Sequence, residues 1–241
     1  MRDDVVIITG DLPETKQIAE LSLKALKHVF IAKIDNLNFG QMQNLRKIAE
    51  ESGVVLLLGI GYKFCSAYNK LNETVQQSMV IEIKHQLNNN KFFISLINDI
   101  DFVTNLLDVN ISKYNVKAWN NTENYPDLLH CCLECDNGSV INATIYTNVE
   151  DVPKLEINFI TSETIINVDI FGSTIKKQNR TGNVIENITL ETYCEKIIYD
   201  YYLQNFDRAI SNDLDALRII DKQYQNIVVA NSIFERIKPI H

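Results

Sequence analysis

Three continuous apolar runs near the start of the chain are separated by two segments with helical periodicity. The runs cover Val5–Thr9, His28–Ala32 and Val54–Leu58. They do not alternate between apolar and polar positions, which is typical of parallel strands buried on both faces. Between them, apolar residues recur one helical turn apart. The order strand, helix, strand, helix, strand with short connections predicts right-handed crossovers in a parallel α/β sheet.

The pattern changes near residue 78, where short segments of β-branched and apolar residues alternate with turn residues. These segments are Met79–Lys84, Tyr114–Trp119, Leu128–Cys135, Val140–Thr147, Leu155–Ile160 and Thr164–Ile170. Asn137-Gly138 lies between two of them and is the strongest hairpin signal in the chain. Helical spacing predicts helices at about 66–76, 92–107, 190–211 and 213–237. We therefore predict a mixed, largely antiparallel sheet followed by two closing helices, and two domains at 1–77 and 78–241.

Composition narrows the function classes. The 241 residues carry a formal net charge of −8, and Lys and Arg are scattered. Nucleic-acid binding needs clustered basic residues, so we expect no nucleic-acid partner. No segment approaches the ~20 apolar residues of a membrane span, so we also expect no membrane partner. The first residues lead straight into a strand without a signal peptide, which favours the cytoplasm.

Five cysteines, an odd number, argue against a disulfide framework in such a chain. Cys132 and Cys135 have the C-x-x-C spacing of a metal or redox pair. The alternative is a half-buried strand over Leu128–Cys135, in which side chains three residues apart point to opposite faces. No second Cys or His pair completes a zinc site, so we expect no metal.

Several of these segments occur in the same order, and with the same spacing, as the sequence motifs of one enzyme family. Val5–Gly10 stands where that family has a strand ending in Thr-Pro. Ala32-Lys33-Ile34 stands where it has Glu-Lys-Pro, and Leu96–Asp101 is similar to its helix carrying His-x-x-Asp. Asn137-Gly138 matches its hairpin. Over nearly its whole length, the chain resembles the Gfo/Idh/MocA oxidoreductases, NAD(P)-dependent dehydrogenases that act mostly on sugars and cyclitols.

The resemblance implies a partial Rossmann-like domain that lacks its first half, followed by an α+β domain onto which the last helices pack back. It implies NAD or NADP as the cofactor, with Thr9, Gly10 and Gly59 in the cofactor site, and a sugar-like substrate. It makes Lys33 the residue that polarises or protonates the substrate oxygen. The family's catalytic His corresponds to Asn98.

The departures from the family are as informative as the matches. The sequence contains no G-x-G-x-x-G, the turn that binds a dinucleotide pyrophosphate. Asn98 cannot shuttle a proton as an imidazole does, and Ile94 replaces the Asp that precedes the family's His. Lys33 has lost both neighbours of its motif, and a solvated lysine after a strand is the alternative interpretation.

Three hypotheses remain open at this point. The chain is a working sugar-type dehydrogenase, or it is a non-catalytic relative kept for binding or for oligomer assembly through the sheet of its second domain. In the third, a further N-terminal segment restores cofactor binding while Asn98 still replaces the His. With no pyrophosphate turn, we expect weak binding of NAD(P) or no cofactor at all. A truncated parallel sheet exposes an edge at Val5–Thr9, and covering that edge predicts a homo-oligomer, such as a dimer.

Overall fold

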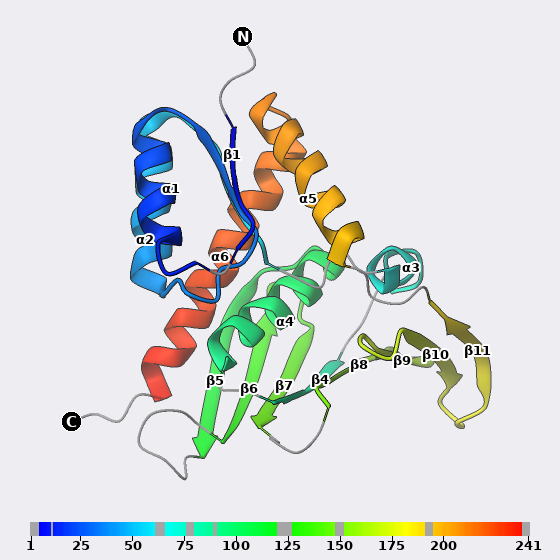
Figure 1. Cartoon of the computed structure of the whole chain (residues 1–241). Helices are drawn as coiled ribbons and strands as arrows, with labels where there is room; N and C mark the ends of the chain where they lie inside the picture. Colours follow the sequence, from blue (N-terminus) through cyan, green and yellow to red (C-terminus); the bar gives the residue numbers. More distant parts are fainter. Residues whose placement is uncertain are drawn as a thin grey trace. The chain divides into compact units, whose positions relative to one another are not determined.

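We describe the protein from a computed structural model that covers residues 5–10, 12–60, 66–75, 80–88, 91–119, 127–147, 152–190 and 195–237. The chain divides into two compact units, which Figure 1 colours along the sequence. The first unit contains residues 1–61 and 195–228, and the second contains residues 62–194 and 229–241. The domain boundary at residue 78 stays a prediction, and we describe the chain by these two units.

The first unit contains the predicted parallel sheet. Its three strands are β1 (Val5–Ile8), β2 (His28–Ile31) and β3 (Leu56–Leu58), in the order β1-β2-β3, with both pairs parallel. The connecting helices are α1 (Thr15–Lys24) and α2 (Phe39–Ser52). The strand–helix alternation read from the sequence is therefore confirmed. Strand β2 lies between its two neighbours, and its last three residues have no exposed surface.

Helix α2 has sequence signals at both ends. The Asn38 side chain accepts a hydrogen bond from the Gln41 N–H, and the Gln41 side chain accepts one from the Asn38 N–H. This reciprocal capping box pairs two backbone donors that no helical carbonyl can reach. At the other end Gly53 adopts a left-handed conformation with φ 64°. A glycine in this conformation is a common end of an α-helix.

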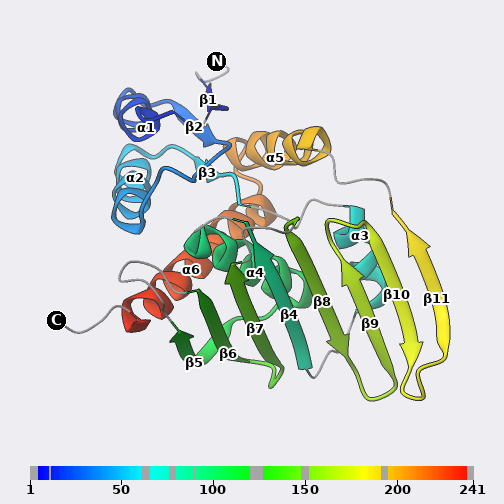
Figure 2. The ribbon, with the colours of Figure 1, turned by 60° about the horizontal axis from the view of Figure 1, so that its bottom comes forward.

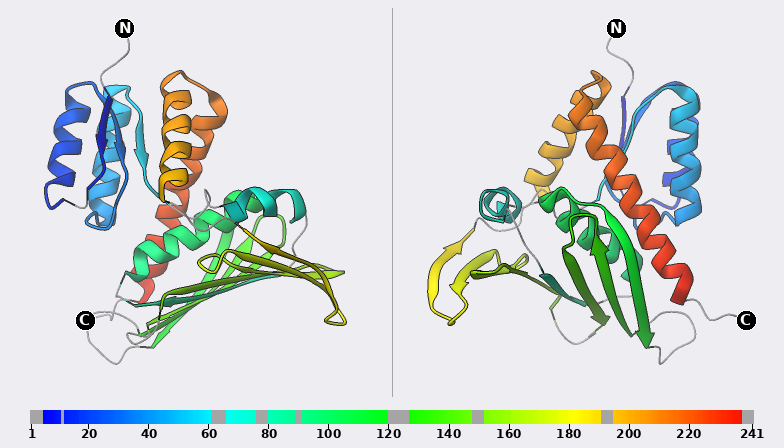
Figure 3. Two further views of the ribbon diagram at one scale, coloured as in Figure 1. Left: turned by 45° about the vertical axis from the view of Figure 1, so that its right-hand side comes forward. Right: turned by 180° about the vertical axis from the view of Figure 1, so that it is seen from behind.

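The last two helices of the chain are α5 (Glu195–Ile210) and α6 (Leu214–Ile237). Figure 3 (left) shows α1 and α2 on one side of the three-stranded sheet and α5 with the first part of α6 on the other. The Phe30 ring of β2 lies 5.3 Å from the Tyr202 ring and 6.1 Å from the Phe206 ring. Helices on both faces explain why these strands are apolar without alternation. No helix in the described ranges is long and apolar enough to cross a membrane.

The second unit contains an eight-stranded sheet in the order β11-β10-β9-β8-β4-β7-β6-β5 (Figure 2). Strand β4 pairs parallel with β7, and every other neighbouring pair is antiparallel. The predicted mixed, largely antiparallel sheet is therefore confirmed. The strands are β4 (Val80–Leu87), β5 (Ile111–Trp119), β6 (Leu128–Cys135), β7 (Val140–Thr147), β8 (Lys154–Ile160), β9 (Thr164–Asp169), β10 (Thr174–Asn179) and β11 (Val184–Thr189).

The turn Asn137-Gly138 forms the predicted hairpin. It joins β6 to β7, and Glu134 pairs with Val140 at the first position of the ladder. Gly138 has φ 85°, a left-handed conformation that glycine adopts without steric cost.

Strands β10 and β11 were not foreseen as separate elements. They carry Lys176, Lys177 and Glu186, and their apolar residues do not alternate regularly with polar ones. All six residues of β11 are exposed or half-buried, so no alternation marks the strand in the sequence. The two strands form by backbone pairing with a neighbouring strand, and a hydropathy pattern does not reveal such pairing.

Two helices, α3 (Ser66–Thr74) and α4 (Phe92–Leu107), lie on one face of this sheet (Figure 3). They contact each other through an edge-to-face pair of Tyr68 and Phe102 rings, 5.7 Å apart. Helix α4 has eleven buried residues and begins and ends at the predicted residues. No described helix or strand of this unit covers the opposite face, which is turned towards the viewer in Figure 2.

Candidate functional site

The carboxyl ends of the three parallel strands meet at one edge of the first unit's sheet. The Ala32 N–H donates to the Ile8 carbonyl at 2.9 Å, and the Gly59 N–H donates to the Ile31 carbonyl at 2.7 Å. These two hydrogen bonds hold the segments after β1, β2 and β3 side by side. Open α/β sheets bind ligands at this edge. Four of the predicted site residues, Thr9, Gly10, Lys33 and Gly59, lie on these segments.

Gly59 is required there by the close approach of two backbones. A Cβ atom built on Gly59 would stand 2.6 Å from the Ala32 carbonyl carbon and closer still to its oxygen. Real Cβ contacts are never this short, so any side chain would push β3 away from the segment that leads to Lys33. The glycine positions the candidate site, because it lets β3 approach the end of β2.

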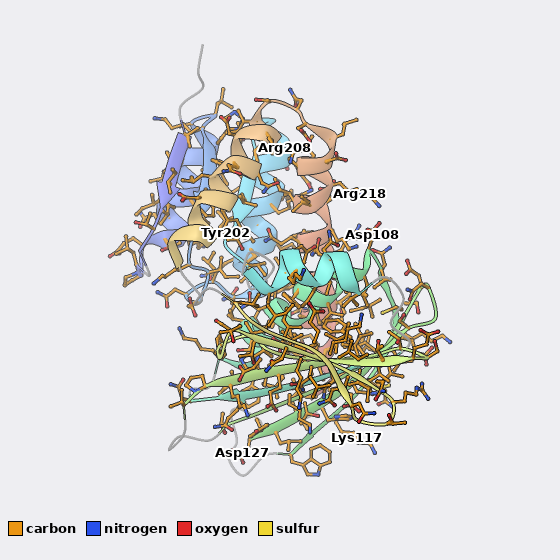
Figure 4. All side chains as sticks on the ribbon, turned by 90° about the vertical axis from the view of Figure 1, so that its right-hand side faces the viewer. Asp108, Lys117, Asp127, Tyr202, Arg208 and Arg218 are labelled. Carbon is orange, nitrogen blue, oxygen red and sulfur yellow. The ribbon has the colours of Figure 1, made fainter. Side chains whose placement is uncertain are left out.

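Two buried side chains hold the end of β3 from the other face. The Gln223 Nε2 atom of α6 donates to the Leu58 carbonyl at 2.9 Å. The Tyr202 hydroxyl of α5 donates to the Ile60 carbonyl, and Tyr202 is labelled in Figure 4. Both side chains add a hydrogen bond to a carbonyl at the end of β3; the Leu58 carbonyl also accepts one from the Ile60 N–H at 2.9 Å. Sequence analysis missed both residues, although a Gln on the apolar stripe of α6 was an available signal.

Lys33 and Thr9 are exposed at this edge, and Gly10 and Gly59 are half-buried. The Lys33 side chain, which follows the last hydrogen-bonded residue of this segment, Ala32, can therefore extend into solvent. An ammonium group in this position can donate a hydrogen bond to a ligand oxygen and polarise a carbonyl. Among the residues that the structure describes, this edge offers the Lys33 ammonium group and backbone N–H donors.

Asn98 belongs to α4 in the second unit, where it is half-buried. Ile94 precedes it by one helical turn and is also half-buried, so the two residues share a face of α4. These are the positions of the family's His and Asp in the resemblance. An Asn amide can donate and accept hydrogen bonds, but it cannot take up a proton. That Asn98 and Lys33 act in one site stays a prediction, because they belong to different units.

A buried histidine–carboxylate pair lies elsewhere in the second unit. The His85 Nδ1 atom of β4 lies 3.1 Å and 2.9 Å from the two carboxylate oxygens of Asp99 on α4. Neither side chain is more than 2% exposed, and the Phe171 ring lies 6.2 Å from the imidazole. Sequence analysis missed this pair. The available signal was His85 itself, a polar residue at an inward position of an alternating strand.

The cysteines of β6 do not form a pair. Cys131 and Cys135 are buried on the helix-covered face, whereas Cys132 is half-buried on the open face. The C-x-x-C thiols therefore point apart, as the strand interpretation predicted. Burial raises the pKa of the Cys131 thiol to about 12, so it is protonated at neutral pH and a poor nucleophile. Within the described ranges, no three His, Cys, Asp or Glu side chains are grouped to hold a metal ion. Cys65 and Cys194 lie outside those ranges.

The structure resembles solved dehydrogenases over almost the whole chain. UDP-N-acetylglucosamine 3-dehydrogenase GnnA from Acidithiobacillus ferrooxidans matches with a TM-score of 0.76 and 16% identity, covering 98% of this chain and 78% of that one. A dehydrogenase from Chromobacterium violaceum matches with a TM-score of 0.75 and 17% identity, covering 97% and 76%. Biliverdin reductase from Synechocystis sp. PCC 6803, solved with biliverdin and NADP+, matches with a TM-score of 0.71 and 15% identity, covering 96% and 78%.

No protein-family model matches the sequence, and no curated protein matches it. The solved structures that match are Gfo/Idh/MocA-type dehydrogenases, as the resemblance read from the sequence implied. At 15–17% identity these matches establish the fold that the chain shares with them. The chemistry of this chain has to be inferred from the residues of its own candidate site.

The close approach at Gly59 generates the first prediction. Gly59→Ala should lower the free energy of unfolding by about 1–3 kcal/mol, because the added methyl group overlaps the Ala32 backbone. Gly40→Ala, in helix α2, is the matched control. Its new Cβ would lie 3.6 Å from the Asn38 Oδ1 atom, so it should stabilise by about 0.5–1 kcal/mol. Urea unfolding of both variants measures the difference, and equal effects would contradict the close-approach argument.

The His85–Asp99 pair generates the second prediction. His85→Leu or Asp99→Leu alone should cost about 3–5 kcal/mol, because each leaves a buried polar partner uncompensated. The double variant should be more stable than either single variant, since neither member of the pair is then buried without the other. The exposed pair of Lys113 and Glu134, 3.5 Å apart, is the control, and its removal should cost about 0–1 kcal/mol. A strictly additive double variant of His85 and Asp99 would show that the two groups are not coupled.

Proposed function

We propose that the chain is a Gfo/Idh/MocA-type oxidoreductase homologue whose binding of NAD(P) and catalysis are impaired or lost. One observation carries this proposal. The ligand-binding edge of the parallel sheet keeps Lys33, while Asn98 takes the place of the proton-shuttling His. Without that His, proton transfer loses a factor of about 10²–10⁴. The substrate class in this proposal is a sugar-like small molecule, whose oxygen Lys33 would polarise.

The cofactor would be NAD or NADP. Biliverdin reductase from Synechocystis was solved with NADP+, and GenD2 from gentamicin A biosynthesis was solved with NAD. In this proposal Thr9, Gly10 and Gly59, which lie at the strand ends, contact the cofactor. The 241-residue sequence contains no G-x-G-x-x-G to hold the pyrophosphate. Each missing charge-assisted hydrogen bond removes roughly 1.5–3 kcal/mol of affinity.

The alternative function is non-catalytic, as a binding or oligomer-assembly protein of the same fold. A specific observation favours it. The edge strand β1 exposes 44% of Val5 and 44% of Ile7, and no described strand pairs with its outer side. Exposed apolar edges are normally covered in native proteins. We therefore propose a homo-oligomer, such as a dimer. A cytoplasmic location fits the odd number of cysteines and is part of this proposal.

Calorimetric titration of the full chain with NAD(H) and NADP(H) tests the enzyme proposal. We expect dissociation constants weaker than about 1 mM, because the phosphates have no anchoring turn. Lys33→Ala should leave that weak affinity unchanged, as should the control Lys47→Ala on the exposed side of α2. Micromolar binding that is lost in Lys33→Ala but kept in Lys47→Ala would show instead that the cofactor site is intact.

A further inference from the structure

The three-stranded sheet of the first unit has two outer edges, and the outer edge of β3 is closed by side chains. The Arg46 guanidinium of α2 lies 2.7 Å from the Asp221 carboxylate of α6 and 5.3 Å from the centre of the Tyr224 ring. Since α2 and this part of α6 lie on opposite faces of the sheet, the ion pair must pass around β3 (Figure 3). A gap of only about 10 Å³ remains between these side chains and β3.

The outer edge of β1 is exposed and apolar. Val5 and Ile7 each expose 44% of their surface, and no described strand pairs with their outer side. Val5–Ile8 contains no charged residue, no proline and no bulge, which are the features that usually prevent pairing at an edge strand. A sheet with one closed edge and one open apolar edge is suited to accept a further strand at the open edge.

The ladder with β2 determines which backbone groups of β1 face outwards. The Ile8 carbonyl accepts a hydrogen bond from the Ala32 N–H at 2.9 Å, so the backbone polar groups of Ile8 point towards β2. The direction alternates along a strand. The N–H and carbonyl groups of Val5 and Ile7 therefore point away from β2, towards the open edge.

Helix α1 continues the apolar surface beside this edge. Its buried residues recur every four positions and face the sheet. The flank with Lys16 and Glu20 is half-buried, and the right-handed crossover from β1 to β2 turns this flank towards α2. The opposite flank carries Ile18 and Leu21, which are 36% and 62% exposed, and it faces the open edge. We call the residues Val5, Ile7, Ile18 and Leu21 the β1 edge surface.

A two-fold axis normal to the sheet at Ile7 makes the β1 edge surface complementary to itself. The two Ile7 residues then exchange both N–H···O bonds across an antiparallel pair, and Val5 lies opposite Thr9 of the second copy. Helix α1 contacts both β1 and β2, so the two α1 axes come to lie about two strand spacings, or roughly 9.6 Å, apart. Packed helices are about 8–10 Å apart. The helices run antiparallel, so Ile18 faces Leu21 of the second copy.

The charges next to the surface favour the same arrangement. Helix α1 follows the exposed Glu14 and ends at the exposed Lys24. An antiparallel pair of α1 helices brings Glu14 of one copy towards Lys24 of the other, an attraction that occurs twice by symmetry.

We propose that β1 pairs antiparallel with β1 of a second copy, with the two α1 helices packed against each other, so that the two three-stranded sheets form one continuous sheet. The inference rests on the homo-oligomer of the proposed function and names its surface. Four side chains from each copy make a small contact, and interfaces at the low end of the size range are weak and transient. We therefore expect a weak dimer whose specificity comes from the backbone ladder.

Disulfide cross-linking of the full chain tests the register. The Cα atoms of a hydrogen-bonded antiparallel pair are about 5.5 Å apart, which suits a disulfide. Ile7→Cys treated with oxidised glutathione should therefore give a covalent dimer on a non-reducing gel. Val5→Cys is the matched control, because Val5 is equally exposed at 44% but would lie about 14 Å from its own copy. It should cross-link no more than the wild type, which measures the background from the five native cysteines.

Three further variants measure the strength of association by sedimentation velocity. Ile7→Lys places like charges against each other at the axis, and Leu21→Lys removes an apolar contact between the helices. Each should weaken dimerisation at least about tenfold. Leu214→Lys changes an apolar residue that is 81% exposed at the start of α6, on the other face of the sheet, and should leave the dimer unchanged. Circular dichroism shows whether each variant is folded.

The outcomes separate this proposal from the one on which it rests. A wild-type monomer at about 100 μM would overturn both the β1 pairing and the homo-oligomer. An oligomer in which Ile7→Cys cross-links no more than Val5→Cys would overturn the β1 pairing alone, as would association that is unchanged in folded Ile7→Lys. None of these outcomes depends on whether NAD(P) binds, so the cofactor proposal can fail independently.

Discussion

Burial of a parallel strand on both faces is the constraint on which the first unit depends. Val29, Phe30 and Ile31 of β2 have no exposed surface, because helices cover the sheet on both sides. That burial brings α5 and α6, which lie about 140 residues further along the chain, onto a sheet formed by the first 60 residues. It also brings Tyr202 and Gln223 to the carbonyls at the end of β3, where the candidate site lies.

The sheet of the second unit is covered by helices on one face only. Its strands alternate, so one face packs against α3 and α4 while the other presents rows of polar side chains. Such a face is tolerated in water, and it is also suited to recognition by a surface of matching pattern. The two sheets therefore differ in what they expose. The first presents an edge where parallel strands end, and the second presents an open face.

The candidate site is a partial one in chemical terms. The parallel edge brings Thr9, Gly10, Lys33 and Gly59 together, and the Gly59 backbone approach keeps the end of β3 against the end of β2. Among the described residues, this edge offers a ligand the Lys33 ammonium group and backbone polar groups. Hydride transfer to a dinucleotide needs more, namely an anchor for the phosphates and a group that exchanges a proton. The fold that the chain shares with the dehydrogenases therefore does not by itself determine whether the chain has their activity.

The sequence by itself determined the elements with strong periodicity. The apolar runs of β1 to β3, the hairpin at Asn137-Gly138 and the extent of α4 follow from local patterns, because each is set by its own side chains. Strands β10 and β11 were decided by tertiary structure, since β10 forms by pairing with β9 and β11 forms by pairing with β10. The His85–Asp99 pair and the contact of Gly59 with Ala32 were also decided there. They join residues from different elements, and a linear pattern contains no information about which buried groups will meet.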